Sequence, residues 1–161
     1  MYLLRQVTLR YNELTLSIAP DPKNIGSYFS EEVCRKSFSG NTTAEATELD
    51  YFFLLKSGED VVGFFRAIDL FFDSEIELHG SYGYKDQSHM RSYFVLSRMF
   101  VATIFGMFPD RQVTTVVNKK NKRAVHYVEW LGFIGVAANR DSADMVNFIL
   151  DEQQYRKEYN A

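Results

Sequence analysis

A chain of 161 residues has the length of one domain and can bury a sizeable core. Its 46% hydrophobic and 24% charged residues are typical of a globular protein and exclude general disorder. The net charge of −3 gives no overall attraction for nucleic acid, and a single cysteine excludes an internal disulfide framework. We expect a single domain over residues 1–161 with a polar C-terminal tail from about residue 153.

The first third of the chain predicts one strand and two helices. Met1–Thr8 is an expected strand, and Leu9–Ala19 an expected short helix closed by the turn Pro20–Pro22. Ser30–Phe38 predicts a second helix, because Ser30 can cap its start. Ser39–Leu49 is polar and predicts a loop or short helix.

A three-strand meander follows. Tyr51–Lys56 and Val61–Phe72 are rich in aromatic and β-branched residues, and Ser57–Asp60 between them is a hairpin signal. Asp73–Ser74 predicts a second tight turn, which leads into the strand Glu75–Tyr84.

The second half predicts a long helix, a strand and a final hairpin. Tyr93–Phe108 is apolar nearly all round, so it should be the most buried helix, stopped by Pro109. It is too interrupted by polar residues to span a bilayer. Arg111–Asn118 reads as a strand, and Gly132–Ala138 and Ala143–Asp151 can pair as a hairpin.

Between these strands, Asn121–Phe133 predicts an amphipathic helix. Asn121 can cap its start and Gly132 can end it. Its apolar arc is formed by Ala124, Val125, Val128 and Leu131.

The spelling of this helix, NKRAVHYVEWLGF, resembles the second conserved motif of the GNAT acetyltransferase superfamily. The matching residues are Asn121, Ala124, Val125, Glu129, Leu131, Gly132 and Phe133. The predicted order of elements is similar as well. The resemblance implies an α/β (α+β) fold, the GNAT acyl-CoA N-acyltransferase-like fold, with a mixed twisted sheet of about seven strands and helices on both faces.

Within that superfamily the chain looks most like short members encoded by tailed bacteriophages. The segments that carry this narrower resemblance are Glu75–His79 and Phe105–Pro109. No secretory signal precedes the first predicted strand, so the expected location is the cytoplasm, or the host cytoplasm or virion for a phage protein. Neither nucleic acid nor a membrane is an expected partner, whereas a homo-oligomer or a protein partner is compatible with the sequence.

The resemblance implies acetyl-CoA as co-substrate, with its pyrophosphate on the N-terminus of the long helix. The expected cofactor-binding residues are Gln87, Ser88, His89, Met90, Arg91, Ser92 and Asn121. Met90 and Ser92 occupy the two positions at which the family loop has glycine, or alanine at the second. The methionine side chain would therefore lie close to the expected position of the phosphate. The alternative is that Ser88 only caps a buried helix and the loop binds nothing.

Glu75, Glu77 and His79 alternate along one predicted strand and should share a face. The aminolysis that the resemblance implies needs a base for the attacking amine, and Glu77 or His79 suits that role. The alternative is an ordinary solvated polar face, and no metal site is expected. Gly80 indicates a close backbone approach where, in the GNAT fold, two strands splay to admit the pantetheine arm.

Many family members protonate the leaving thiolate with a tyrosine on the capped helix. Counting from Asn121, that position holds Val128, while Tyr127 is rotated by about 100° around the helix axis. The basic cluster Lys119–Arg123 beside the cap contains Lys119, Lys120, Lys122 and Arg123. It indicates a solvated face, with a contact for a coenzyme A phosphate or for an acidic partner as the alternatives.

Two hypotheses follow. In the first, the chain is an acetyl-CoA-dependent N-acyltransferase that transfers an acyl group to an unidentified amine. In the second, it is a catalytically inactive GNAT-fold binding or assembly protein, for example a bacteriophage accessory or head-morphogenesis protein. Met90 and Val128 favour the second hypothesis, and the motif favours the first.

Overall fold

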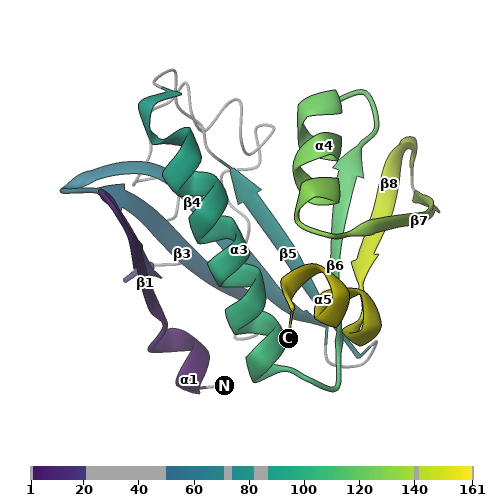
Figure 1. Cartoon of the computed structure of the whole chain (residues 1–161), viewed down its shortest axis with the longest axis horizontal. Helices are drawn as coiled ribbons and strands as arrows, with labels where there is room; N and C mark the ends of the chain where they lie inside the picture. Colours follow the sequence, from purple (N-terminus) through teal and green to yellow (C-terminus); the bar gives the residue numbers. More distant parts are fainter. Residues whose placement is uncertain (1, 21–49, 71–73, 82–86, 140–141, 161) are drawn as a thin grey trace. The chain divides into compact units, whose positions relative to one another are not determined.

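The computed structural model describes residues 2–20, 50–70, 74–81, 87–139 and 142–160 (Figure 1). The segments Ser30–Phe38 and Ser39–Leu49, expected as helix and loop, lie outside these residues. In chain order the elements are α1 (Tyr2–Arg5), β1 (Thr8–Tyr11), β2 (Leu14–Ile18), β3 (Asp50–Ser57), β4 (Asp60–Leu70), β5 (Glu75–Ser81), the 3₁₀ turn η3 (Gln87–His89), α3 (Met90–Met107), β6 (Gln112–Asn118), α4 (Lys122–Trp130), β7 (Ile134–Asn139), β8 (Ser142–Leu150) and α5 (Glu152–Tyr159).

The strands form one mixed sheet of eight strands in the order β1-β2-β3-β4-β5-β6-β8-β7. The predicted class, a mixed sheet combined with helices, is therefore confirmed, although the sheet has eight strands where about seven were expected. The contacts divide the chain into two compact units, residues 1–68 with 80–99, and residues 69–79 with 100–161. The expectation of a single domain stays a prediction.

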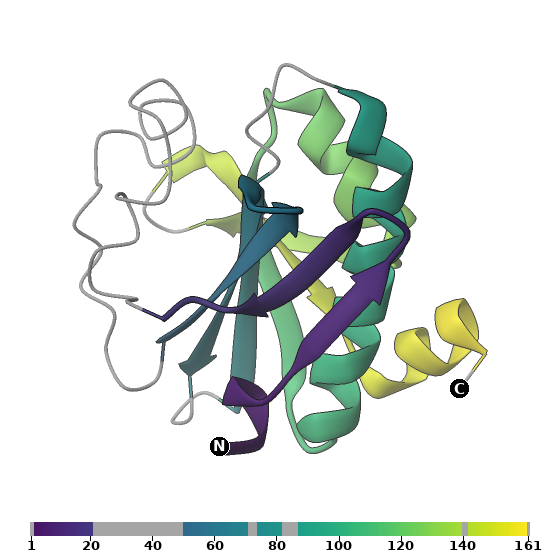
Figure 2. The ribbon, with the colours of Figure 1, turned by 90° about the vertical axis from the view of Figure 1, so that its left-hand side faces the viewer.

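The additional strand comes from the β1–β2 hairpin, which replaces the helix expected over Leu9–Ala19 (Figure 2). The strand expected over Met1–Thr8 is also wrong, because Tyr2–Arg5 forms the helix α1 and β1 begins only at Thr8. Leu14 and Leu16 are fully buried and alternate with Thr15 and Ser17, a period of two that fits a strand. Asn12 turns the chain with φ 50°, a conformation that asparagine tolerates better than most residues.

The predicted meander corresponds to β3, β4 and β5, which are neighbours in the sheet, and β2 adds a further strand beside β3. The strands β2, β3 and β4 pair in antiparallel, and Ser57 pairs with Asp60 across the predicted turn, where Gly58 has φ 61°. The run Tyr51–Leu55 is buried at every residue, so both faces of β3 are covered.

In the other unit, β5 pairs with β6 in parallel, and β6, β8 and β7 pair in antiparallel. The helix predicted from the motif is confirmed as α4, which packs against β6. The side chain of Asn121 accepts a hydrogen bond from the Ala124 N–H at 3.2 Å, and Gly132 ends the turn with φ 100°.

The long helix α3 begins at Met90, earlier than the predicted Tyr93. Its buried residues recur at helical spacing and do not surround the helix, as at Tyr93, Leu96, Phe100 and Ile104. The helix is thus packed by one stripe, whereas burial nearly all round was expected.

The segment expected as a polar tail forms the helix α5, capped by the Asp151 side chain on the Gln154 N–H. Its aromatic residues fix it to the rest of its unit. The Tyr155 ring stacks on Phe105 at a centroid distance of 4.2 Å, and the Tyr159 hydroxyl donates to the Leu131 carbonyl at 2.8 Å.

Two further features concern charge and apolar exposure. Asp69, whose side chain is only 1% exposed, forms an ion pair with Arg111, and its Oδ2 has no partner among the residues that the structure describes. The large apolar residues Trp130, Ile134 and Val136 are about half exposed, and Trp130, at 46%, is the only tryptophan of the sequence.

Replacing Gly132 by alanine should destabilise the protein by about 2–4 kcal/mol. A Cβ there would need positive φ and would lie 2.8 Å from the Glu158 Cγ, so the substitution combines backbone strain with overpacking against α5. Urea unfolding followed by circular dichroism measures the loss.

Two other glycines provide controls for Gly132. Gly58→Ala adds positive-φ strain with no atom within 4 Å, so it should cost only about 1 kcal/mol. Gly106→Ala lies in α3 with open space around it and should stabilise by up to about 1 kcal/mol. If Gly132→Ala lowers the free energy of unfolding by no more than Gly58→Ala does, α5 does not pack closely enough against this turn to exclude a Cβ.

Candidate active site

The parallel strands β5 and β6 pair over only part of their length. The register joins Glu75 to Gln112, Ile76 to Val113 and Glu77 to Thr114. Beyond the last pair, β5 continues to Ser81 and β6 to Asn118, but the two strands no longer pair with each other (Figure 1). The expected splay of two neighbouring strands is therefore confirmed.

Two faces of this region can be read from the register, because laterally paired residues point to the same side of a sheet. Ile76, Leu78 and Val113 lie on one face and are buried. The other face carries Glu75, Glu77, His79, Gln112 and Thr114, and Asn147 joins them because it pairs with Val116. The predicted alternation of polar and apolar residues along β5 is confirmed.

Glu77 and His79 contact each other on this polar face. The Glu77 Oε1 lies 2.5 Å from the His79 Nε2, and the two side chains are 24% and 32% exposed. They come from the same strand two residues apart, so the period of two brings them together. The structure thus joins the two residues expected as alternative bases into one pair.

Gly80 follows His79 where β5 has left β6. A Cβ on Gly80 would lie 2.7 Å from the Phe65 ring, and that ring stacks on Tyr93 at a centroid distance of 5.5 Å. The predicted close approach at Gly80 is confirmed, with Phe65 as the neighbour. The passage of a pantetheine arm at this position stays a prediction.

The expected cofactor loop leads into α3. Gln87, Ser88 and His89 form the turn η3, Met90 is the first residue of α3 and half-buried, and Arg91 is exposed. The first turn of α3 contains no acidic residue, so its N-terminus can accept an anion. The residues of η3 and of the first turn of α3 therefore contribute no negative charge that would oppose a phosphate group.

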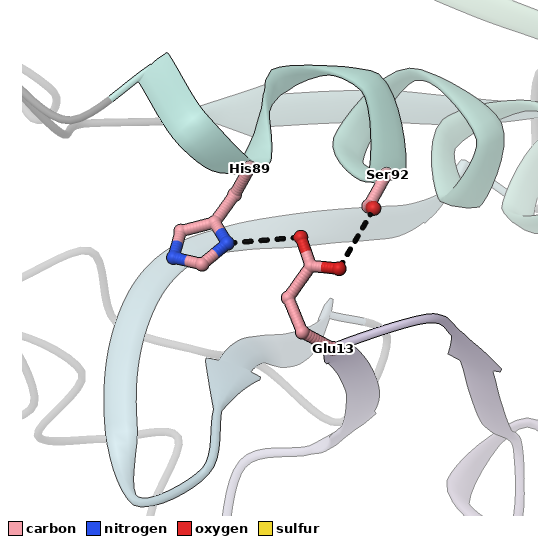
Figure 3. Close-up of polar contacts among 3 residues, drawn as sticks. All are labelled: Glu13, His89 and Ser92. Carbon is pink, nitrogen blue, oxygen red and sulfur yellow. Dashed lines mark hydrogen bonds and ion pairs between the residues drawn. The ribbon is translucent and has the colours of Figure 1, made fainter.

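A carboxylate from another part of the sequence lies at this helix start (Figure 3). The Glu13 Oε1 lies 2.9 Å from the His89 Nδ1, and the Ser92 Oγ donates to the Glu13 Oε2 at 3.1 Å. Ser92 itself is buried, whereas Glu13 is partly exposed. The hydrogen bond from His89 is the largest cause of a lowered pKa of Glu13, and the bond from Ser92 acts in the same direction.

Sequence reasoning did not identify Glu13. It was assigned to a helix over Leu9–Ala19, where its side chain had no predicted neighbour. The available signal was the pattern Leu14, Thr15, Leu16 after Asn12, which favours a hairpin with Glu13 in the turn.

The capped helix α4 places the other expected residues. Asn121 uses its side chain as the cap, so a role in cofactor binding stays a prediction. Val128, at the position of the family tyrosine, is the buried residue of α4, and Tyr127 is half-buried. All residues of the basic cluster Lys119–Arg123 are exposed, and the Lys120 Nζ lies 3.3 Å from the Asp144 Oδ2.

In the part of the chain that the structure describes, no three His, Cys, Asp or Glu side chains are grouped so that they could hold a metal ion. Among the described helices, none has the length and hydropathy needed to cross a membrane.

No family profile and no curated protein sequence matches this chain. Solved structures do match it. A candidate acetyltransferase aligns with a TM-score of 0.69 over 95% of this chain and 90% of its own, at 15% identity. The spermidine/spermine N-acetyltransferase of Vibrio cholerae aligns with a TM-score of 0.67 over 92% and 99%, at 11% identity. The N-acetyltransferase PseH of Campylobacter jejuni aligns with a TM-score of 0.58 over 87% and 99%, at 11% identity.

At these identities the similarity concerns the fold. The chain has the fold of GNAT-type N-acetyltransferases, with β5 and β6 as its two diverging strands and α4 as the helix of the motif. The narrower resemblance to phage-encoded members and the cytoplasmic location stay predictions.

Glu13→Gln should lower stability in a pH-dependent manner. Because the pKa of Glu13 is lowered in the folded protein, its carboxylate stabilises the fold above the unfolded value of about 4.3. That contribution is lost as the pH falls through the lower, folded pKa. The difference in unfolding free energy between the native protein and Glu13→Gln should thus be present at pH 5 and shrink below about pH 4.

Urea unfolding between pH 3 and pH 7 measures this difference. Ser92→Ala is the matched control, because it removes one of the two hydrogen bonds and leaves the contact with His89. A difference that stays the same or grows as the pH falls from 5 to 3 would contradict the assignment of Glu13 as an ionised, bonded carboxylate.

Proposed function

We propose that the protein is an acyl-CoA-dependent N-acyltransferase that acetylates an amine. The observation that carries the proposal is the end of parallel pairing at Glu77–Thr114, in a sheet whose structural neighbours are N-acetyltransferases. Beyond that pair, the main-chain groups that face each other across β5 and β6 do not bond to each other. Such groups can pair with the amide groups of an extended ligand arm, as in other cases of strand addition.

The polar face of β5, β6 and β8 supplies the chemistry of the proposal. One of the pair Glu77 and His79 takes the proton of the attacking amine, and a positioned base of this kind contributes roughly 10²–10⁴-fold to a rate. These three strands carry the carboxylates of Glu75 and Glu77 on that face and contain no lysine or arginine. Their charge favours an acceptor amine that arrives as a cation.

The acceptor is proposed only as a class. A primary amine with a further positive charge fits the acidic polar face, and spermidine is a suitable first compound because one structural neighbour is the spermidine N-acetyltransferase of Vibrio cholerae. The spermidine N-acetyltransferase of Vibrio cholerae forms a dodecamer, and we propose a homo-oligomer for this protein as well.

Val128 occupies the position on α4 where many acetyltransferases of this fold have the tyrosine that protonates the leaving thiolate, and its side chain is buried. A coenzyme A thiolate is stable enough in water to leave without a general acid. We therefore expect the reaction to proceed without a side chain from α4.

Acetyl-CoA should raise the melting temperature of the native protein, because a ligand that binds only the folded state stabilises it by about 2.7 kcal/mol at 100 times its Kd. Ser88→Asp places a carboxylate in the expected phosphate loop and should abolish the shift. Ser88→Asn is the matched control, because it has the same size without the charge, and it should keep the shift. Each variant is compared with its own ligand-free form by thermal denaturation.

An activity assay completes the test. Release of free coenzyme A thiol is followed with acetyl-CoA and a panel of amines that includes spermidine. No thermal shift at millimolar acetyl-CoA, together with no thiol release, would refute the proposal.

The second candidate is a GNAT-fold binding protein that no longer uses acetyl-CoA. The observation that favours it is the Glu13 carboxylate at the start of α3, where the fold otherwise receives a phosphate. Like charges repel, so an ionised Glu13 opposes an anion beside Ser92. Under this second function Glu13→Gln still gives no acetyl-CoA shift, whereas under the first it enlarges the shift of the native protein.

A further inference from the structure

We propose that His79 is the proton acceptor of this site, through Nδ1, and that Glu77 is a positioning residue that acts on His79. The inference rests on the proposed function and deepens it. It is carried by the contact between the Glu77 Oε1 and the His79 Nε2 on the polar face of β5.

The contact with Glu77 determines which nitrogen of His79 carries the proton. An ionised carboxylate only accepts hydrogen bonds, so the His79 nitrogen that contacts Glu77 must be the donor. A neutral imidazole has one N–H, and therefore Nδ1 is left as the acceptor. Among the residues that the structure describes, none forms a hydrogen bond with the His79 Nδ1.

Glu77 is placed to orient His79 and not to act as the base itself. Its carboxylate is engaged with His79 and is less exposed than the imidazole, at 24% against 32%. Glu77 also belongs to the last residue pair that joins β5 to β6, so its backbone is fixed by the ladder. His79 lies two residues further, where β5 no longer pairs with β6. Glu77, on the part of β5 that pairs with β6, thus orients His79, which lies beyond the last pair. A carboxylate orients an imidazole in the same way in other catalytic pairs.

The acceptor first loses its ammonium proton to water. Its neutral nitrogen then attacks the thioester carbonyl carbon, the C–N bond forms as the carbonyl π electron pair moves to oxygen, and a second nitrogen proton passes to the His79 Nδ1. The oxygen electron pair re-forms the carbonyl bond in the next step. The C–S bond then breaks, and its electron pair leaves with the coenzyme A thiolate. The imidazolium returns its proton to the thiolate or to water, so neither an oxidant nor another reactant is needed. Glu77 stabilises the imidazolium and stays ionised throughout.

The tautomer can be measured without any substrate. The sequence contains three histidines, so long-range proton–nitrogen NMR spectra of the labelled protein resolve them at about pH 8.5, where a free imidazole is neutral. We expect His79 with the proton on Nε2. His89 serves as an internal reference, because Glu13 contacts its Nδ1 and it should show the opposite tautomer.

Matched substitutions separate the two histidines. Glu77→Leu should return His79 to a mixture of tautomers and leave His89 unchanged, whereas Glu13→Leu should do the reverse. A His79 that carries its proton on Nδ1, or a spectrum unaffected by Glu77→Leu, would overturn the positioning role of Glu77.

Kinetics then identify the base. In His79→Gln the amide can still donate to Glu77, but it offers no basic nitrogen, so kcat should fall roughly 10²–10⁴-fold with an unchanged KM for acetyl-CoA. Glu77→Leu should lose less, about 10–100-fold, because part of the imidazole keeps the correct tautomer. An active native protein with an unaffected His79→Gln variant would overturn the inference and assign the base to Glu77. A native protein inactive with every amine would overturn the proposed function and the inference together.

Discussion

The end of the β5–β6 ladder at Glu77–Thr114 is the constraint on which the candidate chemistry depends. Backbone N–H and C=O groups inside a sheet normally satisfy one another, and unpaired buried ones are costly. Where two central parallel strands separate, the same groups become available to a ligand. The polar side chains that matter, Glu77 and His79, lie on either side of this change, one on the paired segment and one beyond it.

The separation is built from both sides. β6 is held along its length by β8, with pairs from Val113–Leu150 to Asn118–Met145, and α4 packs on it. The part of β5 that no longer pairs with β6 begins at Leu78 and passes Gly80, whose missing side chain leaves room for the Phe65 ring. An added methyl group there would have to displace a ring that is stacked on Tyr93, so the course of β5 is coupled to aromatic packing.

The sequence predicted well those elements in which local signals agree with the fold. The cap of Asn121, the stop at Gly132 and the alternation from Glu75 to His79 depend on neighbours in the chain, and all three are confirmed. The hairpin at Asn12 was missed because a run of eleven residues with leucines at mixed spacing was assigned the helical period. The contact of Glu13 with His89 and Ser92 joins residues far apart in the sequence, and no local pattern encodes it. The α5 helix was missed because most of its residues are polar. Its two tyrosines hold it in place through contacts with distant residues, since Tyr155 stacks on Phe105 and Tyr159 donates to the Leu131 carbonyl.

The half-exposed Trp130 at the end of α4 has a consequence for spectroscopy. An indole that is already in contact with water in the native state emits at long wavelength, so unfolding changes its emission little. Its fluorescence is a poor measure of global stability. The Trp130 emission instead reports on its local environment. Any molecule that covers the C-terminal end of α4 and excludes water from the indole ring will shift the emission to shorter wavelength.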